Sequence, residues 1–234
     1  MKYSEVRPGL FVSRPNRFVA LVDLDGGRIA AHVKNTGRCR ELLVPGCEVW
    51  LEKAAGTDRR TAYDLVAVRK ILPDGRSLLV NMDSQMPNEA AAEWLPGSGL
   101  LPEGAEIHWE VRYRDSRFDF YMEGGGRRIF CEVKGVTLEE EGRALFPDAP
   151  TVRGIKHLRE LTAALGDGFE AWILFVIQME GVRVFSPNDA AHPEFGRALR
   201  DAVGAGVRVL AVDSRVTPDG LTIRGPVEIA IKLR

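Results

Sequence analysis

The stretch RFDFYMEGGGRRIFCEVKG, residues 117–135, constrains the fold of this chain more than any other segment. Aromatic and β-branched residues lie on both sides of a triple glycine, a pattern that predicts two antiparallel strands joined by a tight turn. Gly125–Gly126 suits a two-residue loop, because glycine accepts the positive φ angles that such turns require. With that loop, Asp119 stands directly opposite Glu132, and both side chains share one face of the sheet.

Three polar side chains, Asp119, Glu132 and Lys134, interrupt this predicted hairpin. Two facing carboxylates repel each other, so one is driven towards protonation unless a cation lies between them. Lys134 follows Glu132 by two residues and therefore projects from the same face. The opposite face is expected to carry the apolar side chains that anchor the hairpin: Phe118, Phe120, Cys131 and Val133. A shift of the register by one residue would separate the two carboxylates.

Carboxylate oxygens on adjacent strands are typical ligands of Mg²⁺ or Mn²⁺, which also accept phosphate oxygens. A lysine beside such an ion can stabilise negative charge that develops on a phosphoryl group. Asp119 followed on the next strand by Glu132-x-Lys134 resembles the PD-(D/E)XK nuclease superfamily, with Phe118 in place of the proline that often precedes the aspartate. The resemblance implies that Asp119 and Glu132 are metal ligands and that Lys134 is catalytic. The alternative is an exposed strand with a weak ion pair.

Nucleases of this superfamily often take a further metal ligand from a preceding helix. Glu93 in the segment NEAAAEWL is expected to fill that place, with Glu89 and Glu110 as competitors. A solvated glutamate on a helix would explain Glu93 equally well. Gln178 ends a buried strand, where it is either a polar residue of the site or an amide that caps the edge of the sheet.

The front part of the chain consists of short candidate strands separated by turns. The turns contain DGG, NTG, PG, AGTD and PDG, all of which favour chain reversal. The candidate strands cover residues 17–24, 28–34, 47–54, 62–71 and 76–81. Five short strands within roughly 70 residues predict a small β-barrel of the OB type, a fold that often binds oligonucleotides. We assign residues 1–84 to this barrel.

Residues 85–234 are predicted to form an α/β domain, a mixed sheet flanked by helices, which makes the chain α+β overall. Strands are expected over 106–113, 169–179 and 207–212, and helices over 87–96, 151–165 and 192–204. Apolar residues recur at helical spacing in 151–165. A strand, helix, strand alternation implies crossover connections that pack the helices on the sheet. Residues 214–234 are expected to form a final hairpin around PDG.

Two groups of residues are candidates for contacts with a nucleic-acid backbone. The front group flanks the RPNR and NTG turns and consists of Arg14, Arg17, Lys34, Asn35, Thr36, Arg38 and Arg40. In the rear domain, Arg153 and Lys156 lie on or beside one face of the helix that follows the Glu-x-Lys strand. An ordinary solvated face would explain the residues of this helix equally well. His157 is expected to pack or to hydrogen-bond, because no second His or Cys has metal-ligand spacing.

Composition excludes several classes of protein. The longest apolar run, WILFVI, is far shorter than the roughly 20 residues that a membrane span needs, and no secretory signal is visible. Three cysteines without a CxxC spacing predict neither a disulfide framework nor a zinc site, so a reduced, cytoplasmic protein is expected. Residues 1–80 carry 14 Lys and Arg against 9 Asp and Glu, and residues 81–234 carry 18 against 24. That asymmetry suits a polyanion held by the front half, although ordinary scatter also produces it.

Several longer segments resemble the sugar fermentation stimulation protein A family. These segments are RPNRFVALV, HVKNTGRCRELLVPG, YDLVAV, RFDFYM, EVKGVTLEEEGRALFPDAPTVRGIKHLREL, FVIQ and RVFSPN. The resemblance extends from about residue 8 to residue 213. It implies an OB-like domain joined to a PD-(D/E)XK nuclease-like domain, sequence-nonspecific DNA binding, and a regulatory role in sugar metabolism, especially that of maltose.

Together these inferences predict a DNA-binding protein with a Mg²⁺- or Mn²⁺-dependent phosphodiesterase site and no membrane partner. One alternative is a DNA-binding regulatory protein whose nuclease-like site is catalytically silent. The other is a small-molecule sensor in carbohydrate metabolism, which ranks last because the sequence has neither a glycine-rich nucleotide loop nor a nucleophile elbow. The sequence leaves the preferred nucleic acid and the oligomeric state open.

Overall fold

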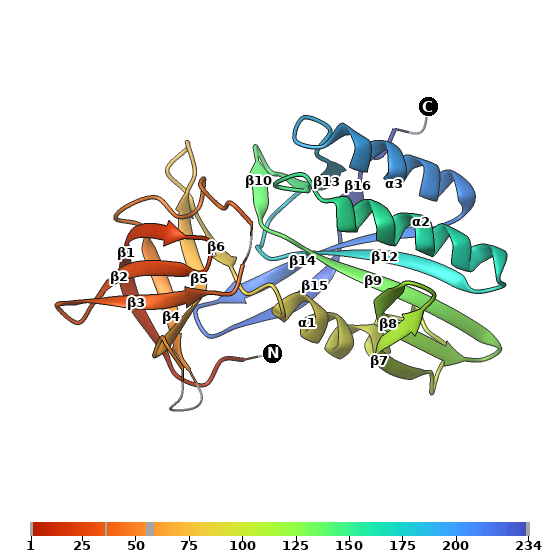
Figure 1. Ribbon diagram of the computed structural model, residues 1–234, viewed down its shortest axis with the longest axis horizontal. Coiled ribbons are helices and arrows are strands. Elements are labelled where there is room, and N and C mark those ends of the chain that lie inside the picture. Colours follow the sequence, from red (N-terminus) through yellow and green to blue (C-terminus); the bar gives the residue numbers. More distant parts are fainter. Residues whose placement is uncertain (1, 36, 55–58, 233–234) are drawn as a thin grey trace.

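The structure of the protein is a computed structural model that describes residues 2–35, 37–54 and 59–232. A β-barrel formed by the front of the chain lies beside a larger region of sheet and helices (Figure 1). Helix α1 (Met86–Trp94) follows the barrel and begins the larger region. The predicted order, a barrel followed by a mixed sheet with helices, is confirmed.

Six strands build the barrel, and five of them close on themselves. They are β1 (Val6–Asn16), β2 (Val19–Leu24), β3 (Gly27–Val33), β4 (Glu48–Lys53), β5 (Tyr63–Ile71) and β6 (Ser77–Asn81). Hydrogen bonds follow the order β3–β2–β1–β4–β5–β6, and a parallel pairing of β3 with β5 closes the barrel. In β2, Ala20, Val22 and Leu24 are buried and alternate with half-buried residues, as expected for a strand with one face on a core.

Five of these strands match the predicted segments, but β1 was not among the five. Its sequence VRPGLFVSRPN contains two prolines and a glycine, residues that are depleted in strands. The register of β1 against β2 shifts between Phe11 and Ser13 and again between Ser13 and Asn16. These irregularities bend the strand and let it pair with both β2 and β4.

A six-stranded mixed sheet forms the centre of the larger region. Its order is β15–β14–β12–β9–β8–β7. The strands are β7 (Glu106–Tyr113), β8 (Ser116–Gly124), β9 (Arg127–Val136), β12 (Glu170–Ile177), β14 (Arg208–Thr217) and β15 (Gly220–Pro226). Strands β9, β12 and β14 run parallel, and the outer strands are antiparallel to their neighbours. Strands β14 and β15 form the hairpin predicted around PDG.

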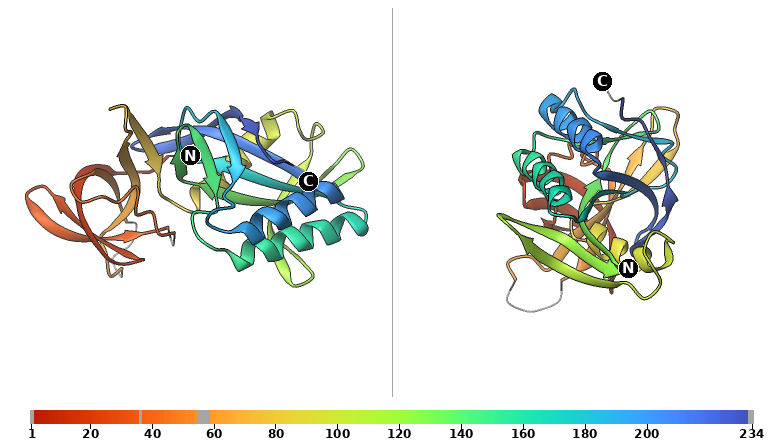
Figure 2. Two further views of the ribbon diagram at one scale, coloured as in Figure 1. Left: turned by 90° about the horizontal axis from the view of Figure 1, so that it is seen from above. Right: turned by 90° about the vertical axis from the view of Figure 1, so that its right-hand side faces the viewer.

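Helices cover both faces of this sheet, which explains its apolar central strand. Helices α2 (Val152–Gly166) and α3 (Pro193–Ala205) lie side by side on one face (Figure 2). Ile173 and Phe175 of β12 join their core cluster, whereas Trp172 and Leu174 join the cluster that contains Ala90 of α1. Since neighbouring residues of a strand point to opposite faces, the buried residues of β12, 171–177, are all apolar.

Four very short strands form a separate small sheet that was not predicted. They are β10 (Leu138–Glu140), β11 (Arg143–Phe146), β13 (Val184–Pro187) and β16 (Glu228–Ile229), in the order β10–β11–β13–β16. Strands of two to four residues are too short to show a hydrophobic period.

Polar contacts fasten the barrel to the larger region. The Gln178 side chain donates from Nε2 to Asn81 Oδ1 and to the carbonyl of Asp83, both at 2.9 Å. Gln178 thus serves as the buried structural amide that sequence analysis left as one of two alternatives. Lys70 of β5 bonds to the Glu139 carboxylate at 2.6 Å. Each of these contacts joins residues far apart in the chain and fixes the barrel against the sheet.

Two predictions from composition can be compared directly with the structure. Among the described residues, no helix is both long and apolar enough to cross a membrane. Cys39, Cys47 and Cys131 all carry free thiols.

Candidate metal centre and nucleic-acid interface

The hairpin of β8 and β9 brings the predicted carboxylates to the point where the two strands separate. Its ladder runs from the glycine turn to the pair Phe120 and Cys131, which is the predicted register. The turn residues Gly125–Gly126 have φ angles of 56° and 78°. Asp119 and Glu132 follow immediately after the last pair of the ladder.

The Asp119 carboxylate takes the place of the next ladder hydrogen bond. Its Oδ2 accepts from the backbone N–H of Val133 at 2.7 Å, and its Oδ1 accepts from Nδ2 of Asn88 on α1 at 2.8 Å. The side chain therefore reaches across the opening between β8 and β9. The sheet tolerates a half-buried carboxylate here because both of its oxygens are hydrogen-bonded.

Phe118 lies on the side of the sheet opposite to the one predicted. Its ring makes an edge contact with the ring of His157 on α2, with 6.3 Å between the centroids. Phe120 belongs to the cluster on the α1 side, together with the other predicted anchors of the hairpin. Side-chain alternation is therefore broken at Asp119, where β8 leaves β9, and the prediction for Phe118 was wrong.

Glu132 is buried and has one oxygen without a partner. The residue is 2% exposed, and its Oε1 contacts both Lys134 Nζ and His157 Nδ1. Oε2 is buried and has no hydrogen-bond partner among the described residues. A buried oxygen in that condition is costly, since it has lost its water without gaining a replacement. Lys134 lies on the same side as Glu132, as predicted.

The two carboxylates have pKa shifts in opposite directions. Burial raises the pKa of Asp119, and the charge of Glu132 raises it further, while Lys134 offsets part of the effect. Burial also acts to raise the pKa of Glu132, but the hydrogen bond with His157 and the charge of Lys134 outweigh burial, so the pKa is lowered. A cation placed nearby would favour the ionised form of Asp119.

Helix α2 brings His157 to Glu132 and Arg153 to His157. Thr151 caps this helix, because its Oγ1 accepts from the backbone N–H of Gly154 at 3.0 Å. His157 is 3% exposed, and its Nε2 lies 3.3 Å from Nε of Arg153, one helical turn earlier. Sequence analysis expected His157 to pack or hydrogen-bond, and it does both. The helical pattern identified its buried face but could not identify Glu132 as its partner.

Helix α1 contributes Asn88 to the site, and sequence analysis missed this residue. Asn88 contacts Asp119, and it immediately precedes Glu89 in the chain. Glu89 and Glu93 are exposed on the same helix. Glu110 is exposed on β7 and pairs with an arginine of β8 at 3.3 Å. Glu93 stays a predicted metal ligand. Asn88 could have been found from the sequence, because it is a polar amide residue on the same predicted helix.

Arg14 ties together the turns that were predicted to share one rim of the barrel. Its Nη1 donates to the carbonyls of Gly37 and Arg38 at 2.9 and 2.8 Å. Its Nη2 donates to the carbonyls of Arg17 and Asn35 at 2.6 and 2.7 Å. The turns therefore do lie together, and the Arg14 guanidinium is occupied in holding them.

Lys34 is surrounded by carboxylates. Its Nζ lies 3.0 Å from Asp83 Oδ2, 3.5 Å from Asp64 Oδ2 and 3.8 Å from Glu52 Oε2. Asn35 is likewise engaged, because its Oδ1 accepts from a backbone N–H at 2.8 Å. Thr36 lies outside the described residues.

The remaining arginines of the front group are not engaged by acidic side chains of the described residues. Arg17, Arg38 and Arg40 are exposed, and in the described part of the chain none of them forms an ion pair with an acidic side chain. Arg17 stacks over the exposed ring of Phe18, with 4.7 Å from Cζ to the centroid. We call Arg17, Arg38 and Arg40 the basic rim.

The basic rim lies against the loop that leads into α2. A Cβ atom at Gly37 would come within 2.4 Å of Asp148 Oδ2, so the two segments touch and a larger residue would not fit without movement. Asp148 precedes the helix cap Thr151 by three residues, and Arg153 follows two residues later. Lys156 faces solvent on the same helix and donates to the carbonyl of Asp115 at 2.7 Å. The turn that carries Arg38 therefore touches the loop that precedes α2.

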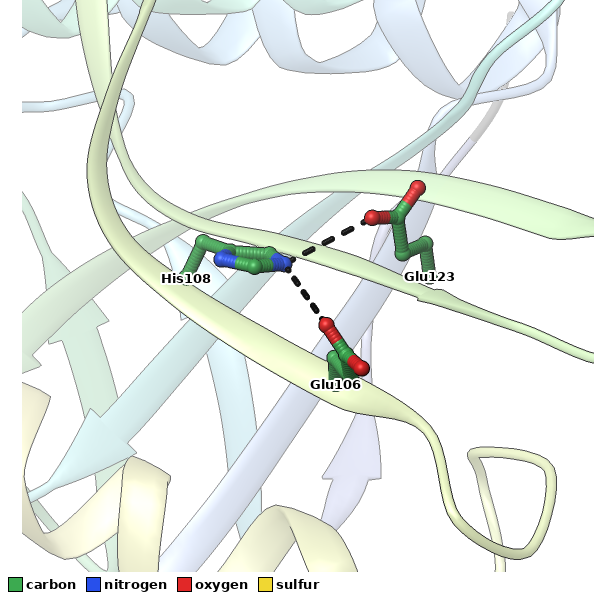
Figure 3. Close-up of side chains that lie close together, drawn as sticks. All are labelled: Glu106, His108 and Glu123. Atoms are coloured by element: carbon green, nitrogen blue, oxygen red, sulfur yellow. Dashed lines mark ion pairs between the residues drawn. The ribbon is translucent and has the colours of Figure 1, made fainter.

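A second group of potential metal ligands lies on the outer hairpin. Glu106, His108 and Glu123 are all exposed, and their ligand atoms lie within 4.8 Å of one another. His108 Nε2 is 3.5 Å from a carboxylate oxygen of each glutamate (Figure 3). Tyr121 stacks on the His108 ring. This group was not predicted, and it is separate from Asp119 and Glu132.

Comparison with known proteins agrees with the fold. The family model described as the SfsA N-terminal OB domain matches residues 12–78, which cover most of the barrel. The model described as the sugar fermentation stimulation protein RE domain matches residues 85–220. The fold class is therefore an OB barrel followed by a mixed α/β region.

The chain belongs to the sugar fermentation stimulation protein (SfsA) family, as the sequence motifs predicted. It is 54% identical over 221 residues to the sugar fermentation stimulation protein homolog of Desulfitobacterium hafniense strain Y51, covering 94% of each chain. It is 46% identical over 231 residues to the homolog of Ruminiclostridium cellulolyticum, covering 99% of this chain and all of the other. A solved structure of Pyrococcus furiosus SfsA in complex with Ca²⁺ is similar, with a TM-score of 0.85 and 31% identity over 99% of this chain and 98% of the other.

Proposed function

We propose that this protein binds DNA without sequence preference and hydrolyses its phosphodiester bonds at a site that contains Asp119, Glu132 and Lys134. The relatives' name, sugar fermentation stimulation protein, agrees with a role in sugar metabolism. We include in the proposal a regulatory role in that metabolism, and in that of maltose in particular. Mg²⁺ or Mn²⁺ is the proposed cofactor.

The observation that carries the proposal is the unpartnered Oε2 of Glu132. It is a buried oxygen of a carboxylate whose pKa is lowered, and the charge of Glu132 helps to raise the pKa of a second carboxylate, Asp119. Such a pair fits a hard divalent cation, which takes oxygen ligands and relieves the repulsion between them. The Ca²⁺ in the complex of the Pyrococcus furiosus relative is consistent with a divalent ion in this family.

Each residue of the site has a distinct role in this proposal. Asp119 and Glu132 would hold the ion, with Glu93 as the further carboxylate. When bound, the ion would supply an activated water and neutralise charge on the phosphate. Asn88 and the Val133 N–H orient Asp119. Lys134, beside Glu132, would stabilise the negative charge that develops on the phosphoryl group.

The basic rim supports the DNA-binding part of the proposal. Arg17, Arg38 and Arg40 are exposed and form no ion pair among the described residues, and Gly37, next to Arg38, touches the loop before α2. Arg153 is exposed at the start of that helix. Arginine side chains of this kind bind phosphate oxygens without reading bases, so the binding is expected to tolerate any sequence.

Cleavage of a labelled duplex and of a labelled single strand in Mn²⁺ tests the proposal. Asp119→Asn and Lys134→Met should each abolish cleavage. Asp119→Asn removes the negative charge of a metal ligand, and Lys134→Met removes the positive charge beside the phosphate. The matched control is Glu123→Gln in the exposed group on the outer hairpin, which should cleave as the wild type does.

Product from Asp119→Asn equal to that of the wild type would refute the assignment of the site. DNA binding by the wild type without product under Mg²⁺ or Mn²⁺ would instead support a silent nuclease-like site. Thermal stabilisation by sugars without any effect of DNA would favour the small-molecule sensor.

A further inference from the structure

His157 joins two charged groups that the proposed function uses. On one side its Nδ1 contacts Glu132 Oε1, and on the other its Nε2 lies 3.3 Å from Arg153 Nε. The residue is 3% exposed, and its ring makes an edge contact with Phe118. The imidazole is therefore fixed in place, and both of its nitrogens are in use.

The hydrogen bonds define which nitrogen carries the proton. Arg153 Nε can only donate, so His157 Nε2 must accept. The proton then resides on Nδ1, which donates to Glu132 Oε1. A histidine with this arrangement fixes the orientation of both partners relative to each other, because rotation of the ring would break both hydrogen bonds.

The first consequence concerns the direction of the Glu132 carboxylate. Oε1 is held by His157 and by Lys134, which leaves Oε2 as the unpartnered oxygen. Carboxylates that ligate metals are commonly fixed by such outer hydrogen bonds, and loss of one weakens metal binding.

The second consequence concerns Arg153. Its Nε is occupied by His157, whereas Nη1 and Nη2 form no ion pair among the described residues. The free edge of a guanidinium presents two parallel N–H groups, which match two oxygens of a phosphate. Arg153 is exposed near the start of α2, so that edge can meet a ligand.

We infer that His157 is a positioning residue that aligns Glu132 for a divalent ion and Arg153 for a phosphate group of the substrate. This inference rests on the proposed function and adds to it a defined phosphate contact beside the ion. The competing explanation is that His157 only fills the space between α2 and the sheet.

Two substitutions at His157 separate these explanations. His157→Asn retains an N–H donor close to the position of Nδ1 but loses the acceptor for Arg153. His157→Leu fills similar space and loses both. Titration calorimetry of the metal-free protein with Mn²⁺ alone should show His157→Asn within about threefold of wild-type affinity. It should show His157→Leu weakened by about 10- to 100-fold.

Binding of a 20-base-pair duplex, measured by anisotropy in Ca²⁺, tests the second contact. Arg153→Gln should keep wild-type Mn²⁺ affinity and lose about tenfold in duplex affinity. His157→Asn should lose duplex affinity to a similar extent, and the double variant should lose no more than either single variant, since the two residues act through one contact. Arg197→Gln, at an exposed arginine of α3 that is paired with Glu194 at 3.0 Å, is the matched control and should change neither measurement.

The outcomes separate this inference from the proposed function. A wild type that binds no Mn²⁺ overturns the metal site and the inference with it. A wild type that binds Mn²⁺ while His157→Leu binds equally well overturns only the positioning role. Because a buried substitution can prevent folding, long-range ¹⁵N–¹H NMR of the wild type provides a second measurement. A proton on Nε2 of His157 would contradict the inference, and a proton on Nδ1 supports it.

Discussion

Replacing Arg17 with glutamine should remove one phosphate contact and thereby reduce the salt dependence of DNA binding. Seven basic residues were predicted from sequence to contact the backbone: Arg14, Arg17, Lys34, Arg38, Arg40, Arg153 and Lys156. Three of them already make contacts within the protein. Arg14 donates to four carbonyls, Lys34 lies close to three carboxylates, and Lys156 donates to the Asp115 carbonyl. Four arginines remain available.

These four contacts set the expected magnitude. Each phosphate neutralised contributes about −0.9 to the slope of log K against log salt, so four contacts give a slope of about −3.6. Raising the salt from about 50 to about 200 mM should then weaken binding by about 150-fold. In Arg17→Gln the slope should fall to about −2.7.

Fluorescence anisotropy of a labelled random-sequence duplex across a salt series measures these slopes. Arg28→Gln is the matched control, because it removes an exposed charge that is already paired with Asp23 at 2.9 Å. It should leave the slope unchanged. A wild-type slope of about −6 would mean that the engaged residues also contact phosphate, and a slope near zero would refute the basic rim.

The cluster around Lys34 carries two further predictions. Lys34→Met should lower the free energy of unfolding in urea by about 3 kcal/mol, because Asp83 would stay buried without its cation; a loss below about 0.5 kcal/mol would contradict this. Burial acts to raise the pKa of Asp64, but the hydrogen bond from Arg59 and the charge of Lys34 outweigh it, so the pKa is lowered. Stability from this group is present above the unfolded pKa of about 3.9 and is lost as the pH falls through the lower folded value. Urea unfolding between pH 7 and pH 2.5 should therefore show a smaller acid loss in Asp64→Asn, and equal losses in both proteins would exclude this role.

Local patterns in the sequence predicted much of the fold. The double glycine set the register of β8 and β9, because a two-residue turn leaves only one pairing. The amphipathic spacing of α2 and α3 and the apolar run of β12 identified the central sheet and its helices. Strand β1 was missed, since Pro8 and Pro15 are unusual in a strand and are accommodated only by its irregular pairing.

The site depends more heavily on tertiary contacts. Sequence spacing brought Asp119 and Glu132 together but could not show that the ladder ends one pair earlier and that Phe118 changes face. His157 could be placed on a buried helix face, but its partner lies on another element. Charge counting could not separate the engaged Lys34 from the available Arg38, because the carboxylates around Lys34 come from three other segments of the chain.

Anomalous diffraction from crystals soaked in Mn²⁺ tests the proposed metal centre most directly. A peak within bonding distance of Glu132 Oε2 and of the Asp119 carboxylate is the predicted result. A peak only at Glu106, His108 and Glu123, or none at a concentration that saturates binding in solution, would contradict it.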